Sequence, residues 1–269
     1  MTLMNPRERI DRGWRTQTEI FGAPALEPQT IYESSWRDYI FAEVWTRPGL
    51  DRRSRYWIAI SSAAGALVQP EILDGYIRGA LKDELMTLEE LREGALHFAV
   101  YEGWSKGRFF DAAVTRVANE LGLPPVPYET VRPHPWDPQV RDREGGENFA
   151  TIMCSPAPPP KTAYFLGGIR GFVFAEMWMR PGLDQRARRW ITLVGVADSS
   201  SEIPIKSHIW AALASGDATP EEMEEFVLQY ATQAGWPMAS FVQTTVIAMN
   251  QRFLERQNNS MSAELRGLP

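Results

Sequence analysis

The sequence predicts an all-α protein built from two copies of one helical domain. Helix caps and apolar faces with a helical period run through the chain, and almost no stretch alternates apolar and polar residues as a half-buried strand does. A segment of the first half also recurs in the second. The hydrophobic share of 44% and charged share of 23% are ordinary for a globular protein, so general disorder is excluded.

The repeat is clearest in one eleven-residue segment. FAEVWTRPGLD at 41–51 returns as FAEMWMRPGLD at 174–184, an offset of 133 residues. Further on, GW at 103–104 returns at 235–236, where the offset is 132. One residue is therefore missing from the turn around 64–70. A single deletion with the register kept on both sides is what two homologous helical units would show.

A proline-rich segment separates the two copies. Residues 122–161 carry ten of the chain's twenty prolines. Proline lacks an amide donor and disfavours helix in the residue before it, so we predict an extended linker rather than regular helix. The predicted organisation is a first domain at 1–122, a linker at 123–161, a second domain at 162–258 and a tail at 259–269.

Helix starts can be read from capping residues. Thr87 and Thr219 each stand before a turn with a glutamate at its third position, which is a capping box. Asp51 and Asp184 follow a Pro-Gly break and cap the next helix, which is apolar and predicted to be central. Each copy then has about five helices. The residues that share a helical face behind the two threonines are Leu88, Leu91, Ala95, Phe98 and Ala99 in the first copy, and Met223, Phe226, Val227 and Tyr230 in the second.

Charge and cysteine content exclude several classes of protein. The net charge of -6 argues against affinity for nucleic acid or for an anionic membrane, and no apolar run approaches the roughly 20 residues that span a bilayer. The first residues, MTLMNPRERIDRGWR, lack the apolar core of a signal peptide. Cys154 is the single cysteine, which excludes an internal disulfide and fits a reducing compartment. We expect a cytoplasmic protein.

Several segments together resemble the carboxymuconolactone decarboxylase family. In the first copy they are FAEVWTRPGLDRRSR at 41–55, RIDRG at 9–13, EIFG at 19–22, RGAL at 78–81 and AVYEG at 99–103. In the second copy the likeness runs from about 165 to 253. The resemblance implies an AhpD-like helical fold and decarboxylation of a lactone acid without metal or organic cofactor. It also implies rings of six domains, so a tandem chain is expected to form a homotrimer.

The chain departs from the family at positions that matter for chemistry. Where the family commonly has a histidine, four residues before the alanine of RGAL, the first copy has Tyr76 and the second has His208. An early family segment with a histidine after the glycine reads GAPA at 22–25 here. The peroxidase branch uses Cys-x-x-Cys-x-x-x-His, but Ser201 and Pro204 stand in the cysteine places, which excludes thiol peroxidase chemistry.

Decarboxylation needs an anion-binding group, a donor for the developing enolate oxygen and an acid that protonates carbon. His208 is the best candidate acid because imidazole titrates near neutral pH. Its neighbours Ile205, Ile209 and Ala212 make an apolar face, so a hydrogen-bonded core histidine is the alternative.

Glu43 and Glu176 lie between phenylalanine and tryptophan, where a carboxylate should have a raised pKa unless an arginine pairs with it. Their catalytic interpretation is acid, base or orienter of the histidine. Their structural interpretation is an ion pair, with Arg55 and Arg188 as the candidate partners. The same two arginines are candidates for binding a substrate carboxylate.

Four further residues are candidates for substrate binding. Arg78 in the first copy would bind a carboxylate if it faces a pocket, and would otherwise face solvent; Trp210 takes its place in the second copy. Tyr76 and Tyr101 either donate to an enolate oxygen or fill the core. His97 follows three glutamates and is predicted at the surface.

His134 falls in the linker, and the three histidines show no spacing typical of a metal site. Three functions stay open at this stage. The first is a cofactor-independent lyase acting on a small cyclic or aromatic-derived carboxylic acid. The second is the same pocket redirected to isomerisation, cyclisation or hydrolysis. The third is a non-catalytic scaffold or ligand-binding trimer, which would be favoured if no small-molecule pocket lies beside His208 or if Trp210 and Trp236 fill that pocket.

Overall fold

The computed structural model describes residues 5–131 and 137–266, and every regular element in these ranges is a helix, as predicted. In chain order the elements are α1 (Pro6–Phe21), α2 (Ile31–Ser35), η1 (Trp36–Val44), α3 (Arg52–Gly65), α4 (Pro70–Lys82), α5 (Leu88–Glu102), α6 (Trp104–Glu120), α7 (Pro138–Met153), η2 (Tyr164–Phe174), η3 (Met177–Met179), α8 (Gln185–Asp198), α9 (Glu202–Ala214), α10 (Pro220–Ala234) and α11 (Trp236–Arg266). The elements η1 and η2 are π-helices, and η3 is a single 3-10 turn. Within the described ranges no helix is both long and apolar enough to span a membrane.

The predicted helix starts are confirmed. The Asp51 carboxylate accepts the amide of Ser54 at 2.8 Å at the start of α3, and Asp184 accepts that of Ala187 at 2.8 Å at the start of α8. Thr87 begins α5 with a complete capping box, and the start of α10 has the same arrangement. The apolar faces predicted behind these caps are buried. Local capping chemistry therefore sets where the central helices begin.

The extended linker is wrong for residues 138–153, which form α7. The Asp137 carboxylate accepts the amide of Gln139 at 2.7 Å, and Pro138 occupies the first helical position, where its missing amide has no partner to lose. His134, which the sequence places in this linker, lies outside the described residues. The described part of the chain thus contains a helix, α7, that the high proline content of this segment had led us not to predict.

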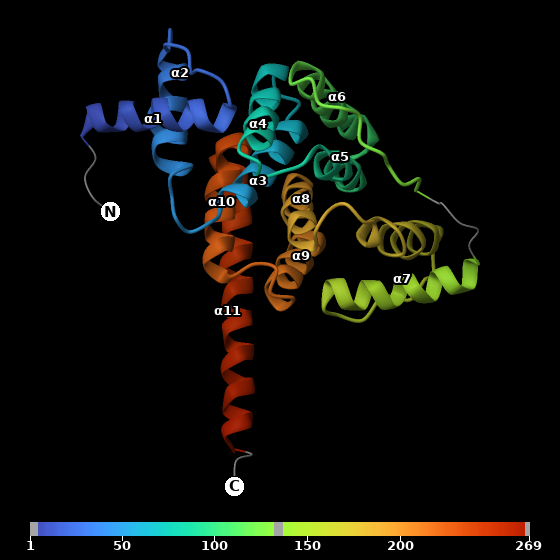
Figure 1. Ribbon diagram of the computed structural model, residues 1–269. Helices are drawn as coiled ribbons and strands as arrows, with labels where there is room; N and C mark the ends of the chain where they lie inside the picture. The colour runs from blue at the N-terminus through green and yellow to red at the C-terminus, as the bar shows by residue number, and fades with distance from the viewer. Residues whose placement is uncertain (1–4, 132–136, 267–269) are drawn as a thin grey trace.

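The central helices are α3 and α8, which pack against each other (Figure 1). Nearly all of their side chains are buried. Helix α5 from the first half of the chain packs on α8, and α10 from the second half packs on α3. Two helical hairpins, α1 with η1 and α7 with η2, project on opposite sides of this centre, and α11 runs away from it. The two halves therefore exchange one helix each across the core.

The two projecting hairpins close in the same way. Gly13 of α1 lies against the backbone carbonyl of Arg37 in η1, and Gly145 of α7 lies against that of Arg170 in η2. A Cβ atom at either glycine would overlap that carbonyl. These glycines are 132 residues apart in sequence and the arginines 133, the offsets at which the sequence segments recur.

A pair of carboxyl groups joins the ends of α5 and α8. The carboxyl groups of Glu102 and Asp198 both lie beside Gly65; Asp198 accepts the hydroxyl of Tyr230 at 2.5 Å, and Lys106 donates to Glu102 at 2.6 Å. The missing side chain of Gly65 makes room, since a Cβ there would lie 2.7 Å from Asp198 Oδ2. Burial first, and then the negative charge of Asp198, raise the pKa of Glu102 to about 7, although the hydrogen bond from Lys106 acts in the opposite direction. A carboxyl–carboxyl hydrogen bond requires that one of the two be protonated.

We expect Glu102→Gln to remove a pH dependence of stability. The folded state holds the Glu102 proton more tightly than the unfolded state, so its stabilising effect is full below about pH 4.5 and is lost as pH rises through 7. The loss should be on the order of 1–3 kcal/mol. Urea unfolding from pH 5 to 8 measures it. Glutamine donates to Asp198 at every pH, so the variant should show a flatter profile, and an unchanged profile would contradict the shared proton.

Candidate active site

Helix α8 directs two consecutive arginines into the protein. Arg188 is 1% exposed and Arg189 is fully buried. Arg188 donates to the backbone carbonyls of Met177 and Arg180 at 3.0 and 2.8 Å. The Arg189 Nε donates to Asp217 at 2.8 Å, and its guanidinium lies over the ring of Trp178, 4.8 Å from the centroid. Two adjacent cations are thus held close to the centre of the fold.

His208 lies on the buried face of α9, where its ring contacts that of Tyr101. It is 8% exposed, and its neighbours Ile205 and Ile209 are buried as predicted. Burial first, and the positive charge of Arg189 second, lower the pKa of His208 to about 3, so its ring is neutral at neutral pH. No carboxylate contributes to this shift.

One atom of each of these two residues is buried without a hydrogen-bond partner among the described residues. These atoms are the Arg189 Nη1, which can only donate, and the His208 Nδ1. A buried donor without an acceptor is unfavourable by about 1–3 kcal/mol, more when it is charged. Each of the two residues therefore keeps one buried polar atom for which the described residues supply no partner.

His97 was predicted at the surface, and this prediction is wrong. The side chain is 1% exposed and lies between Arg188 and Thr192. Its Nδ1 is 3.3 Å from Arg188 Nη1, and its Nε2 is 2.9 Å from Thr192 Oγ1. Burial first and Arg188 next hold the pKa of His97 well below its usual range. The preceding glutamates looked like a solvent face, but Glu93 is itself paired with Arg180 at 2.5 Å.

Aromatic side chains complete this cluster. Tyr101 is one helical turn beyond His97 on α5, and its oxygen accepts the indole N–H of Trp178 at 2.8 Å. Its ring lies perpendicular to that of His208 with the centroids 5.5 Å apart. Burial raises the pKa of Tyr101 to about 12. Tyr101 and His208, predicted site residues from different halves of the chain, are thus in contact.

The opposite face of the core carries a related cluster with different groups. Arg55 donates to Gln229 at 3.1 Å and to Glu225 at 2.9 Å, and Glu225 also pairs with Arg47. Tyr76 is fully buried and its hydroxyl accepts from Gln233 at 3.2 Å. We call Arg47, Arg55, Glu225 and Gln229 the Arg55 cluster, and Glu93, His97, Arg180, Arg188 and Thr192 the Arg188 cluster. The Arg55 cluster holds no imidazole.

Neither predicted glutamate pairs with the arginine that we expected. Glu43 pairs with Arg9 at 3.0 Å, and Glu176 pairs with Arg141. These arginines lie on α1 and α7, so both glutamates fasten the projecting hairpins. Arg55 and Arg188 make other contacts. The structural interpretation of both glutamates as ion-paired groups is therefore right, but the partners were wrong.

Arg78 and Trp210 also have other partners. Arg78 forms a bidentate ion pair with Glu120, with N–O distances of 2.7 and 2.8 Å, on the outer side of the first half of the chain. Trp210 lies beneath Arg252, whose guanidinium is 4.6 Å from the ring centroid. Trp236 is 54% exposed and lies beside Tyr39. The ring contacts of both tryptophans are thus with residues other than His208.

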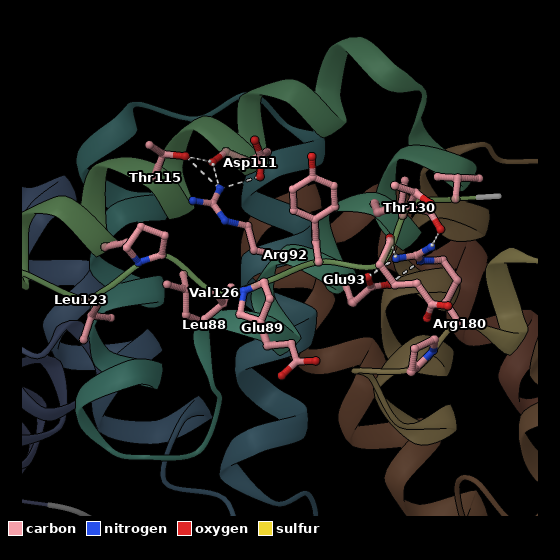
Figure 2. Close-up of a pocket in the computed structure, with 18 of the residues that line it drawn as sticks. Leu88, Glu89, Arg92, Glu93, Asp111, Thr115, Leu123, Val126, Thr130 and Arg180 are labelled. Carbon is pink, nitrogen blue, oxygen red and sulfur yellow. Dashed lines mark hydrogen bonds and ion pairs between the residues drawn. The ribbon is translucent and has the colours of Figure 1, made fainter. Parts of the chain in front are cut away.

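A separate pocket of about 840 Å³ lies between α5 and α6 beneath the segment 123–131 (Figure 2). Arg92 in it is held by Asp111 at 2.6 Å. Arg180 is held by Glu93 and also donates to the backbone carbonyls of Glu129 and Thr130. Both guanidiniums that line this pocket are thus paired with carboxylates. None of the residues predicted for the site belongs to its described lining.

The His208 site, which we define as His208, Arg189, Tyr101 and Trp178, can hold an anion and exchange a proton with it. Arg189 supplies a permanent charge, and His208 supplies a titratable nitrogen. Among the described residues no group of three or more His, Cys, Asp or Glu side chains is placed to hold a metal ion. The sequence pattern had singled out His208 and Tyr101 and missed Arg189. A charge inside an otherwise apolar helix was the available signal for it.

Comparison with curated proteins finds similarity to two decarboxylases. Over 130 residues the chain is 28% identical to the 4-carboxymuconolactone decarboxylase of Acinetobacter baylyi, a match that covers 45% of this chain and 96% of that protein. Over 105 residues it is 31% identical to the nitrosuccinic acid decarboxylase of Metarhizium robertsii, which covers 36% of this chain and 72% of that protein. No protein-family model matches the chain.

Proposed function

The chain belongs to the carboxymuconolactone decarboxylase family, and from this premise we propose that it is a lyase that decarboxylates a small carboxylic acid at the His208 site. The observation that carries the proposal is the pair of buried, unpartnered nitrogens on Arg189 and His208. A carboxylate of the substrate satisfies both. The pocket beneath residues 123–131 is less suited, because neither of its guanidiniums has a buried, unpartnered nitrogen among the described residues, as Arg189 has in addition to its pair with Asp217.

In the proposed reaction Arg189 binds a carboxylate, and the bond between the substrate carbon and the departing CO2 breaks. The electron pair left on carbon delocalises into an adjacent acceptor group, and His208 delivers a proton to that carbon. The bound anion offsets the charge of Arg189, one of the two causes that lower the pKa of His208. Substrate binding therefore favours the protonated imidazole that the reaction needs.

We further propose that the chain contains two units of this family. Almost the whole length of the Acinetobacter protein corresponds to less than half of this chain. The matched hairpins and the two arginine clusters support the same arrangement. Only the Arg188 cluster adjoins an imidazole with an unpartnered nitrogen, so we propose one working site per chain.

We also propose that the chain associates with copies of itself, as a trimer of two-unit chains. Each projecting hairpin exposes large apolar side chains: Ile31 is 88% and Tyr32 64% exposed beside η1, and Tyr164 is 69% exposed in η2. Exposed apolar groups of this kind are typical of subunit contacts. The substrate itself would be a small-molecule carboxylate.

We expect Arg189→Met to raise KM by about tenfold to a hundredfold, because a charged hydrogen bond to the substrate carboxylate contributes about 1.5–3 kcal/mol. CO2 release from 4-carboxymuconolactone and from nitrosuccinate, the acids named by the two relatives, measures it. Arg143→Met on α7, where the side chain is 63% exposed, is the matched control and should keep the wild-type KM. A wild-type KM in Arg189→Met would remove this residue from the site, and no CO2 from the wild type with either acid would contradict the proposed substrates.

A further inference from the structure

The His208 site is closed in the structure. Arg189 is fully buried and His208 is 8% exposed, so an acid reaches them only when an element that covers them moves. Helix α7 packs on α9, and in its last turn Ile152 and Met153 are buried in one apolar cluster with Trp178, a member of the site. The end of α7 therefore forms part of the cover.

A hydrogen bond holds this part of the cover in place. The Arg189 Nη2 donates to the backbone carbonyl of Ile152, while Nε donates to Asp217 and Nη1 has no partner among the described residues. When the turn moves away, Arg189 also loses the Ile152 carbonyl. A carboxylate bound by both terminal nitrogens then replaces it, and a carboxylate is a stronger acceptor for a guanidinium than a neutral carbonyl is.

The last turn of α7 is capped less firmly than that of α1. Cys154, directly after α7, has a φ of +50°, a left-handed conformation that is unfavourable for a residue with a Cβ atom. At the corresponding place after α1 stands Gly22, whose N–H donates to the carbonyl of Glu19 at 3.0 Å. No backbone carbonyl among the described residues accepts the Cys154 N–H. Unwinding this turn therefore releases strain that the end of α1 does not carry.

The end of α1 is also seated more closely against its neighbours. The carbonyl of Ile20 accepts the hydroxyl of Tyr56 at 3.1 Å, and it lies so near Gly79 that a Cβ atom there would overlap it. The residue 132 positions after Gly79 is Ala211, which has that Cβ atom, so the end of α7 cannot approach α9 in the same way. Beyond this end, the hairpin of α7 and η2 projects from the centre of the protein (Figure 1).

We propose that the last turn of α7, residues 150–153, is the gate of the His208 site, and that a substrate carboxylate opens it by replacing the Ile152 carbonyl on Arg189. The nature of this acid rests on the proposed lyase function. Opening unwinds the turn, lets Cys154 leave the left-handed conformation and uncovers both terminal nitrogens of Arg189. The turn forms again when the product leaves.

Amide hydrogen exchange of this turn measures opening without turnover. In Arg189→Met the Ile152 carbonyl loses its donor, so the amides of 150–153 should exchange about tenfold faster than in the wild type, with no acid present. Residues 18–21 at the end of α1 are the internal control and should keep their rate. Arg143→Met on the exposed side of α7 should change neither segment. Wild-type exchange at 150–153 in Arg189→Met overturns the gate.

A second variant strengthens the closed state instead of weakening it. Glycine adopts the left-handed conformation without strain, so Cys154→Gly should slow exchange at 150–153 by about fivefold. Because fewer molecules are then open to the acid, KM should rise by the same factor while kcat stays nearly constant. Cys154→Ala keeps a Cβ atom and lacks the thiol, so it should match the wild type. Unchanged exchange in Cys154→Gly, or the same rise of KM in Cys154→Ala, contradicts the proposal.

The gate and the lyase function can fail separately. If the wild type releases no CO2 from 4-carboxymuconolactone or nitrosuccinate, but exchange is faster in Arg189→Met and slower in Cys154→Gly, the lyase function is refuted and the gate stands. If CO2 is released and Cys154→Gly has the KM and the exchange rate of the wild type, the lyase function stands and the gate is refuted.

Discussion

His208→Gln is expected to lower kcat for CO2 release by about 10²–10⁴, the usual contribution of a positioned acid. Glutamine occupies a similar volume and keeps a hydrogen-bonding group beside Arg189, but it has no proton to give to carbon at neutral pH. Helicity and assembly should be unchanged, because position 208 lies on a helix face whose packing comes from Ile205, Ile209 and Ala212.

The matched control is Lys206→Ala on the exposed side of the same helix, where the side chain pairs with Glu202 alone among the described contacts. It should turn over like the wild type. The wild-type rate should fall as pH rises through the pKa of His208 in the substrate complex, and this limb should vanish in His208→Gln. A glutamine variant with wild-type kcat and an intact alkaline limb would show that another group is the acid.

Glu225→Ala is expected to destabilise the fold by about 3–5 kcal/mol, because it leaves a buried guanidinium without its counter-charge. Arg55 is 1% exposed and donates to Glu225 at 2.9 Å, and Arg47 pairs with the same carboxylate at 2.6 Å. Since Glu225 lies on α10 and both arginines precede or begin α3, the loss also loosens the contact between the two halves. The midpoint of urea unfolding measures the change.

An exposed ion pair provides the control for this effect. Glu120 pairs with Arg78 at 2.7 Å, but the Glu120 side chain is 50% exposed, so Glu120→Ala should change stability by less than about 1 kcal/mol. Glu225→Gln keeps an acceptor for Arg55 and should be intermediate. If Glu225→Ala and Glu120→Ala have the same midpoint of urea unfolding, the buried pair between Arg55 and Glu225 contributes no more to stability than an exposed pair.

The fold was predictable where local chemistry decides it. Asp51, Asp184 and the two threonine caps are read from neighbours within four residues, and the structure confirms all four helix starts. Helix α7 was missed because proline was counted over forty residues. Within Pro138–Met153 the single proline stands at the first helical position, where it is tolerated, and the rest of the helix has none.

The site was predictable only in part, because its contacts join residues far apart in sequence. His208 and Tyr101 were identified from their residue types, and the structure brings them together across 107 positions. The burial of His97 was missed because Glu93, on the same helix, looked like part of a solvent-exposed face. In the structure Glu93 forms an ion pair with Arg180 from the other half of the chain. The sequence repeat could have corrected the prediction for this face of the helix. The offset of 132 residues that aligns 103 with 235 also aligns Glu93 with Glu225.

The exchange of α5 and α10 across the centre has a consequence for how the two clusters can change. In a ring of identical short chains, any substitution beside an arginine is copied into every equivalent position at once. Here His97 contacts Arg188 and Gln229 accepts from Arg55 within one covalent molecule, so the residues around each arginine can change independently. The Arg188 cluster can keep its imidazole while the Arg55 cluster serves only to hold helices together, and a single polypeptide carries both.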